Sequence, residues 1–318
     1  MILTDYYRSF PDSTWEIGRQ LGVEYGVIRL PEDREFDPAC REHWLTVYKR
    51  FKDYGIRPLV IEPMPNSLHE HIKSGDGKRD ESIEQVLKMF PVMDELDIRT
   101  ICFNWMAYAG WTRTRDDIME RGNAKVTGFS AKEYKPLDIS ITSEQLWHNY
   151  EYFIRAVLPE AEKFGIRLAL HPDDPPVEKL GNISRIMVSA ENIMHAVRDY
   201  ADSPNLGITF CQACYYLMGK DLYSIIPELS DKIMFIHFRN VTGTKNCFRE
   251  TFHDNGDLDM PKLIKCYYEC GLDVPIRVDH VPAMAGETSV NPGYDALGRL
   301  YAIGYLKGIL DAMSASHS

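Results

Sequence analysis

The chain has 318 residues, 44% of them hydrophobic, which is enough for either two ordinary domains or one large α/β barrel. Its formal net charge of -11 repels phosphate backbones and anionic membranes, so we expect no nucleic-acid partner, and the sequence contains no apolar run of bilayer length. The N-terminal stretch does not resemble a signal peptide, and the seven cysteines show no disulfide framework, so we expect reduced thiols and a cytoplasmic protein.

Short apolar segments of strand length recur along the whole chain. Most follow a helical pattern that ends near a glycine, as in "AEKFGIRLAL". Strands that alternate with helices form parallel sheets, and this number of repeats in one chain predicts a single (β/α)8 TIM barrel over residues 1–318. The eight segments are residues 1–7, 24–30, 57–63, 99–105, 167–172, 206–211, 233–240 and 275–280.

The interval between the fourth and fifth segments is longer than the others. Its second part reads as a helix opened by a capping box of Thr142 and Gln145. The first part, residues 107–141, is therefore predicted to be an insertion after the fourth strand, on the face where barrel enzymes build their active sites. We interpret it as a lid; a decorative or oligomer-forming loop is the alternative.

Side chains that can bind a metal stand at the ends of the last four predicted strands. They are His171, Cys211, His237 and Asp279, and His280 follows directly. Taken singly, a strand-end histidine is usually a core residue and a buried cysteine a small hydrophobe. Because adjacent strands deliver these groups to one mouth, together they predict a metal site. Imidazole, thiolate and carboxylate donors favour manganese, iron(II) or zinc over calcium or magnesium.

Cys211 also belongs to a Cys-x-x-Cys pattern with Cys214. Such a pair can be a redox centre or half of a zinc ribbon. The sequence has no second pair of this kind and no thioredoxin-like context around it. The pattern is therefore weak support for either reading.

Several longer motifs resemble the mannonate dehydratase (UxuA) family. They occur in the family's order and cover most of the chain, and "HPDDPP" and the "WTRT" segment are specific to it. After Asp279 and His280 the chain departs from the family pattern, with "DHVPAMAG". The matching motifs are "IEPMPNSLHEHIKSG" (61–75), "CFNWMAYAGWTRT" (102–114), "HPDDPP" (171–176), "ITFC" (208–211), "IHFRNV" (236–241), "HDNGDLDM" (253–260), "DH" (279–280) and "PGYDALGRL" (292–300).

The resemblance implies a xylose-isomerase-like TIM barrel that converts D-mannonate, or a close aldonate, to 2-keto-3-deoxy-D-gluconate in hexuronate catabolism, with one Mn²⁺ or Fe²⁺ ion. It implies the same four metal ligands that the strand ends indicate. It also implies a catalytic pair, His280 and Tyr294; strand-end placement alone would not have singled out Tyr294. The expected partner is a small sugar acid, and we expect a homo-oligomer, a dimer or a tetramer.

The chemistry explains why such groups are needed. A hydrogen next to a carboxylate is a weak acid, so its removal requires a divalent ion that stabilises the enediolate, a base for the C2 proton and an acid for the departing hydroxyl. A histidine and a tyrosine can divide the last two roles in either order.

Candidate substrate contacts are Asn104, Arg113, Arg239 and Asn240. An arginine fork suits a carboxylate, although a structural ion pair is the alternative. Two other functions stay open. A divalent-metal sugar isomerase or epimerase would share the barrel, although thiolate ligation argues against it. A non-catalytic barrel homologue would not need both His280 and Tyr294. A metal-dependent endonuclease is disfavoured by the acidic charge.

Overall fold

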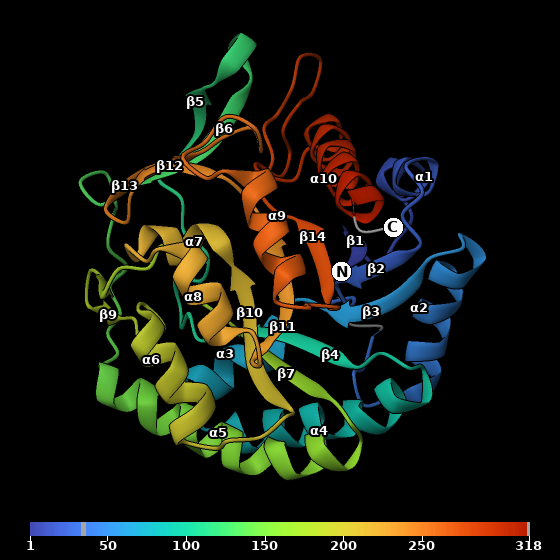
Figure 1. Cartoon of the computed structure of the whole chain (residues 1–318). Helices are drawn as coiled ribbons and strands as arrows, with labels where there is room; N and C mark the ends of the chain where they lie inside the picture. The colour runs from blue at the N-terminus through green and yellow to red at the C-terminus, as the bar shows by residue number, and fades with distance from the viewer. Residues whose placement is uncertain (33–35, 317–318) are drawn as a thin grey trace.

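A closed barrel of parallel strands forms the centre of the molecule (Figure 1). The computed structural model describes residues 1–32 and 36–316. The strands follow the order β1-β14-β11-β10-β7-β4-β3-β2 around the barrel, and each predicted segment supplies one of them. The predicted (β/α)8 fold is therefore confirmed. The barrel strands are β1 (Ile2–Tyr7), β2 (Tyr25–Ile28), β3 (Arg57–Ile61), β4 (Thr100–Asn104), β7 (Arg167–His171), β10 (Leu206–Cys211), β11 (Ile233–Phe238) and β14 (Pro275–Val278).

Helices surround the barrel (Figure 1). The predicted capping box opens the helix α5: Gln145 N donates to Thr142 Oγ1 at 3.2 Å, and Thr142 N donates to Gln145 Oε1 at 2.9 Å. Among the described residues, every helix is too short or too polar to span a membrane. The α-helices are α1 (Ser13–Gln20), α2 (Arg41–Asp53), α3 (Asn66–Ser74), α4 (Arg79–Glu95), α5 (Ser143–Lys163), α6 (Ala190–Met194), α7 (Gln212–Leu217), α8 (Leu222–Leu229), α9 (Met260–Glu269) and α10 (Ala296–Ser316), and a short π-helix, η2 (His195–Asp199), follows α6.

Two apolar clusters hold the fold together, because successive strand residues point to opposite faces. A small cluster inside the barrel includes Val60, Cys102 and Ala169. The large cluster contains their strand neighbours, such as Ile61 and Phe103, together with the inner faces of the helices. The two clusters are formed by residues within the strands, so the ends of the strands can carry polar side chains.

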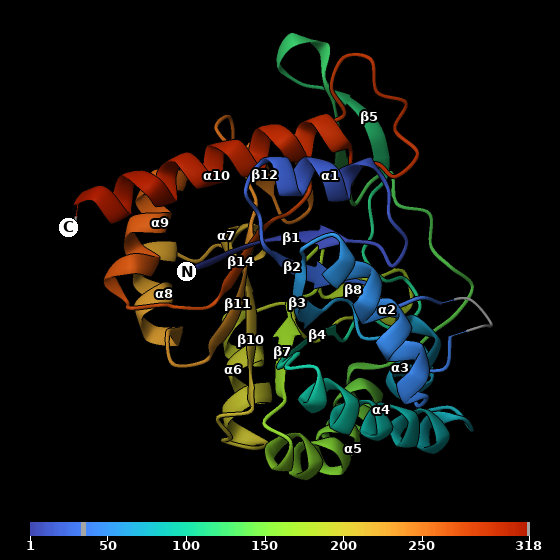
Figure 2. The same ribbon diagram turned by 90° about the vertical axis from the view of Figure 1, so that its right-hand side faces the viewer.

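A second, antiparallel sheet lies beside the barrel; we call it the accessory sheet. Its strands are β5 (Arg115–Met119), β6 (Lys125–Ser130), β12 (Val241–Thr244) and β13 (Cys247–Glu250), in the order β12-β13-β6-β5. The hairpin that carries β5, with a 3-10 turn at η1 (Arg121–Asn123), projects beyond the barrel in both views (Figure 1 and Figure 2). A two-stranded sheet of β8 (Lys179–Leu180) and β9 (Ile183–Ser184) completes the strands of the described residues.

The accessory sheet unites two distant parts of the chain. Residues 107–141, predicted as an insertion after the fourth strand, supply β5 and β6, and the segment after β11 supplies β12 and β13. Backbone bonds between Lys125 and Ala283, at 2.8 and 3.0 Å, also attach β6 to the segment that follows β14. Sequence reasoning did not predict the β12–β13 hairpin. The lid function of residues 107–141 stays a prediction.

Candidate metal and catalytic site

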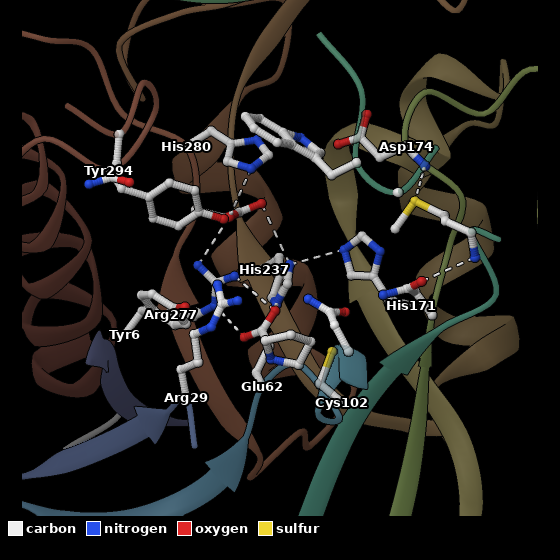
Figure 3. A pocket seen from close by; sticks show the side chains of 18 of the residues that line it. Tyr6, Arg29, Glu62, Cys102, His171, Asp174, His237, Arg277, His280 and Tyr294 are labelled. Carbon is white, nitrogen blue, oxygen red and sulfur yellow. Dashed lines mark hydrogen bonds and ion pairs between the residues drawn. The ribbon is translucent and has the colours of Figure 1, made fainter. Parts of the chain in front are cut away.

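A cavity of about 450 Å³ opens where the barrel strands end. Barrel pairing places the strand-end residues side by side: Asn104 is opposite His171, and Cys211 is opposite His237. Figure 3 shows the labelled side chains of this cavity pointing toward a common space. The predicted site residues that line it are Asn104, His171, His237, Asp279, His280 and Tyr294.

Three of the four predicted metal ligands form one group. The ligand atoms of His171, Cys211 and His237 all lie within 4.8 Å of one another. Cys211 is completely buried and lies behind the cavity lining. Asp279 is not part of this group, although its Oδ2 lies 3.5 Å from His237 Nδ1.

The histidine geometry suits a shared ion. His171 Nδ1 lies 2.7 Å from the carbonyl oxygen of Pro172, so it donates there and leaves the lone pair on Nε2. That Nε2 lies 3.1 Å from His237 Nδ1. With metal–nitrogen bonds of about 2.1 Å, two donors on one ion are about 3.0 to 3.4 Å apart, so these residues fit a metal.

The surroundings of Cys211 favour the protonation state that a metal ligand requires. Burial alone would raise the pKa of Cys211, but a hydrogen bond from Cys214 and the charge of Arg239 hold it well below its usual range. Arg239 Nη1 lies 3.6 Å from the Cys211 sulfur. A thiolate, not a thiol, binds metals. These contacts favour a thiolate at Cys211 with Cys214 as its hydrogen-bonding neighbour, and both cysteines are free of disulfides.

A second group shares His237 but is less suited to an ion. It consists of Glu62, Cys102 and His237. Both oxygens of Glu62 are already bonded by Arg277, at 2.8 and 2.9 Å, and His237 Nε2 lies 3.0 Å from Glu62 Oε1 without hydrogen-bond alignment. Burial and the charge of Glu62 raise the pKa of Cys102 to about 11, so it remains a thiol at neutral pH.

His280 and Tyr294 face each other at the edge of the cavity. Their ring centroids are 5.5 Å apart, and Figure 3 shows both side chains. The ring of Trp111 from the insertion lies 4.6 Å from that of His280. His280 has a φ of 34°, a strained value for a residue with a side chain. Burial and the charge of Asp279 raise the pKa of Tyr294 above its ordinary value, so the phenol is protonated at neutral pH.

Three predicted substrate contacts do not line the cavity. Arg113 and Arg239 are buried in ion pairs with Asp174, whose Oδ2 lies 2.9 Å and 2.6 Å from their Nη atoms. Asn240 donates to the carbonyl oxygens of His253 and Leu258 and so fixes a loop. For the two arginines the structure shows the ion-pair alternative.

Sequence reasoning missed several charged residues of the cavity, among them Glu62, Lys73 and Arg277. Glu62 follows β3, and comparing the polar residues at all the strand ends, rather than at the last four, would have found it. Lys73 is on α3 with 1% of its side chain exposed, and its Nζ donates to the Met106 carbonyl oxygen at 3.0 Å. A lysine on a helix usually indicates a solvated face, so no local signal pointed to it.

Comparison with known proteins agrees with this geometry. The family model described as D-mannonate dehydratase (UxuA) matches residues 40–140 and 131–318. The mannonate dehydratase of Brachyspira hyodysenteriae is 30% identical over 353 aligned positions, covering 98% of each chain, and that of Streptococcus agalactiae serotype III is 32% identical over 86% of each.

Solved structures give the same result. The crystal structure of mannonate dehydratase from Streptococcus suis serotype 2 superposes with a TM-score of 0.89 at 27% identity, covering 100% of this chain and 95% of that one. A D-tagatose 3-epimerase-like protein shares the fold alone, with a TM-score of 0.65 at 14% identity. The family model matches most of the chain, and the motifs and the barrel agree with that match. The chain therefore belongs to the D-mannonate dehydratase family.

Proposed function

We propose that this protein is a hydro-lyase that removes water from D-mannonate, or a close aldonate, to give 2-keto-3-deoxy-D-gluconate. The observation that carries the proposal is the convergence of a thiolate–imidazole donor group with His280 and Tyr294 on one cavity, in a chain of this family. A site that only bound a ligand would not need both a proton acceptor and a proton donor there.

We propose Mn²⁺ or Fe²⁺ as the resident ion. His171, Cys211 and His237 would hold it, and Asp279, whose Oδ2 lies 3.5 Å from His237 Nδ1, would complete the set. When bound, the ion supplies Lewis acidity that stabilises negative charge on the substrate carboxylate and its neighbouring oxygen.

The protonation state of Tyr294 divides the catalytic roles. Tyr294 is a neutral phenol, so it can supply a proton, and we assign it to the departing C3 hydroxyl. His280 then accepts the C2 proton at Nε2. The electron pair of the C2–H bond forms a C2–C3 double bond as the C3–O bond breaks, and the hydroxide leaves as water with the proton of Tyr294. The resulting enol rearranges to the 2-keto acid.

The cavity also offers groups for the rest of the substrate. Oδ1 of Asn104, at the end of β4, lies 3.5 Å from Lys73 Nζ, and both residues line the cavity. We propose that the Asn104 amide donates to substrate oxygens, and that the Lys73 ammonium, whose hydrogens already serve Glu70, Met106 and Asn104, attracts the substrate carboxylate by its charge. Asn104 is thus retained from the predicted substrate contacts, and Lys73 takes the place of Arg113 and Arg239.

The first experiment incubates the manganese- or iron(II)-loaded protein with six-carbon and five-carbon aldonic acids and measures 2-keto-3-deoxy acid. We expect product from D-mannonate or a close aldonate. His280→Asn and Tyr294→Phe should keep the metal and lose about 10²-fold or more in rate, the usual scale of a positioned proton-transfer group. Loss of metal in these variants would contradict their assignment. Interconversion of aldoses and ketoses without loss of water would instead show an isomerase.

A further inference from the structure

Glu250, the last residue of β13, contacts His280 from outside the cavity. Its carboxylate is buried, with 1% of the side chain exposed. Oε1 lies 3.2 Å from His280 Nδ1 and 2.5 Å from Arg113 Nη2, while Oε2 accepts a hydrogen bond from Arg239 Nε at 2.9 Å. Glu250 does not line the cavity, so it can act on the reaction only through a neighbour.

The surroundings of Glu250 keep its carboxylate ionised and in place. Asp174 bonds both Arg113 and Arg239, so two carboxylates and two guanidinium groups alternate in a closed, neutral ring. Burial alone would raise the pKa of Glu250, but Arg239 and Arg113 hold it below its ordinary value. An ionised carboxylate only accepts hydrogen bonds.

The ionised carboxylate of Glu250 determines which nitrogen of His280 carries the hydrogen. The 3.2 Å contact with Glu250 requires the hydrogen on Nδ1. Arg113 Nη2, 3.5 Å from the same nitrogen, only donates and would favour the opposite tautomer. With the hydrogen on Nδ1, the lone pair is on Nε2, which lies 3.6 Å from Asp279 Oδ1 at the cavity.

We propose that Glu250 is a positioning residue for the dehydration: it holds His280 as the Nδ1–H tautomer, keeps Nε2 available to the C2 hydrogen, and stabilises the imidazolium that forms. The same division of labour occurs wherever a carboxylate orients a catalytic histidine. The inference rests on the proposed function, in which His280 is the base. It also gives the accessory sheet a role, because β13 is paired with β6 of the insertion and carries Glu250 to His280.

Kinetics of two Glu250 variants, each in the wild-type and in a His280→Asn background, test the proposal. Glu250→Met removes the acceptor at nearly constant shape, and we expect kcat to fall about 10²-fold with KM and metal content within about threefold of wild type. Glu250→Gln keeps one acceptor oxygen, and its loss should be smaller. In a His280→Asn background, either change should lower kcat by less than about threefold, because the group it positions is already gone.

Nitrogen NMR of histidine-labelled, zinc-loaded protein reads the tautomer without any reaction; Zn²⁺ has a filled d shell and does not broaden the signals. The His280 signals are assigned from their absence in His280→Asn. We expect Nδ1–H in wild type and Nε2–H in Glu250→Met. Asp174→Asn is the matched control: it removes a carboxylate from the same ring without touching His280, and should leave the hydrogen on Nδ1.

The outcomes separate clearly. A folded Glu250→Met with wild-type kcat, an unchanged tautomer, or a loss that adds in full to that of His280→Asn would each overturn the proposal. If Glu250→Met does not fold, the non-additivity criterion is applied to Glu250→Gln, and additive losses there also overturn it. If wild type forms no product from any aldonate, the proposed function has failed, while the tautomer shift still decides the role of Glu250.

Discussion

At the scale of single residues, neighbouring groups give different pKa values to two buried cysteines that look alike in the sequence. Cys102 and Cys211 each belong to a potential ligand group that includes His237. Cys211 is held as a thiolate by Cys214 and Arg239 against the effect of burial, whereas burial and the charge of Glu62 keep Cys102 a thiol. The Arg277 guanidinium on Glu62 further disfavours a cation in the second group.

We therefore expect Cys211→Ala to lose the divalent ion and Cys102→Ala to retain it. The two variants remove the same atom from equally buried sites, so each is the control for the other. Elemental analysis after dialysis measures the ion, and anomalous diffraction locates it. Loss of the ion in Cys102→Ala would refute the assignment. So would an ion more than about 3 Å from the Cys211 sulfur, because a thiolate bond to a metal is about 2.3 Å.

At the scale of elements, the insertion contacts the site directly. Gly110 and Trp111 line the cavity, and Trp111 is 37% exposed while its ring lies against His280. The backbone N–H of Tyr108 donates to Glu70 Oε2 at 3.1 Å, which joins the start of the insertion to α3. An insertion that lines the cavity and leaves part of Trp111 exposed is placed to order over a bound substrate.

Limited trypsin digestion tests the lid. Exposed basic residues at Arg115, Lys125 and Lys132 offer cleavage sites in the insertion. Bound substrate should slow cleavage there several-fold, because shielding a reactive enediolate from water requires an ordered cover. Cleavage after Lys163, at the end of α5 on the opposite face of the barrel, serves as the control and should not change. Equal rates in the insertion with and without substrate would count against a lid.

At the scale of the whole molecule, the metal group joins three barrel strands, β7, β10 and β11. An ion that binds the folded chain and not the unfolded one stabilises it by about 2.7 kcal/mol when present at 100 times its Kd. The acidic surface, with a net charge of -11, does not oppose cation binding. The predicted homo-oligomer stays a prediction.

Removing the ion with a chelator should therefore lower Tm by several degrees, and adding Mn²⁺ should restore it. Differential scanning calorimetry of the native chain and of Cys211→Ala measures the effect. The variant is the matched control, because without a ligand its Tm should not depend on Mn²⁺. A similar shift in both proteins would show that the stabilising ion binds elsewhere.

The sequence alone determined the barrel and most of the candidate metal group, because both depend on local patterns. Alternating strand and helix patterns specify a parallel barrel, and a residue at the end of a strand must lie at the mouth. His171, Cys211 and His237 follow from that rule. Tyr294 did not; it came from the family resemblance, since its position in a loop before α10 carries no periodic signal.

Only the tertiary structure decided what the buried charges do. Arg113 and Glu250 are 137 positions apart and meet because β6 pairs with β13, so no sequence window could distinguish a substrate contact from an ion pair. Lys73 is buried because α3 turns it toward the cavity, although its residue type favours solvent. Periodicity determines which face a residue occupies, whereas a charge acquires its role from partners that the fold brings from elsewhere in the chain.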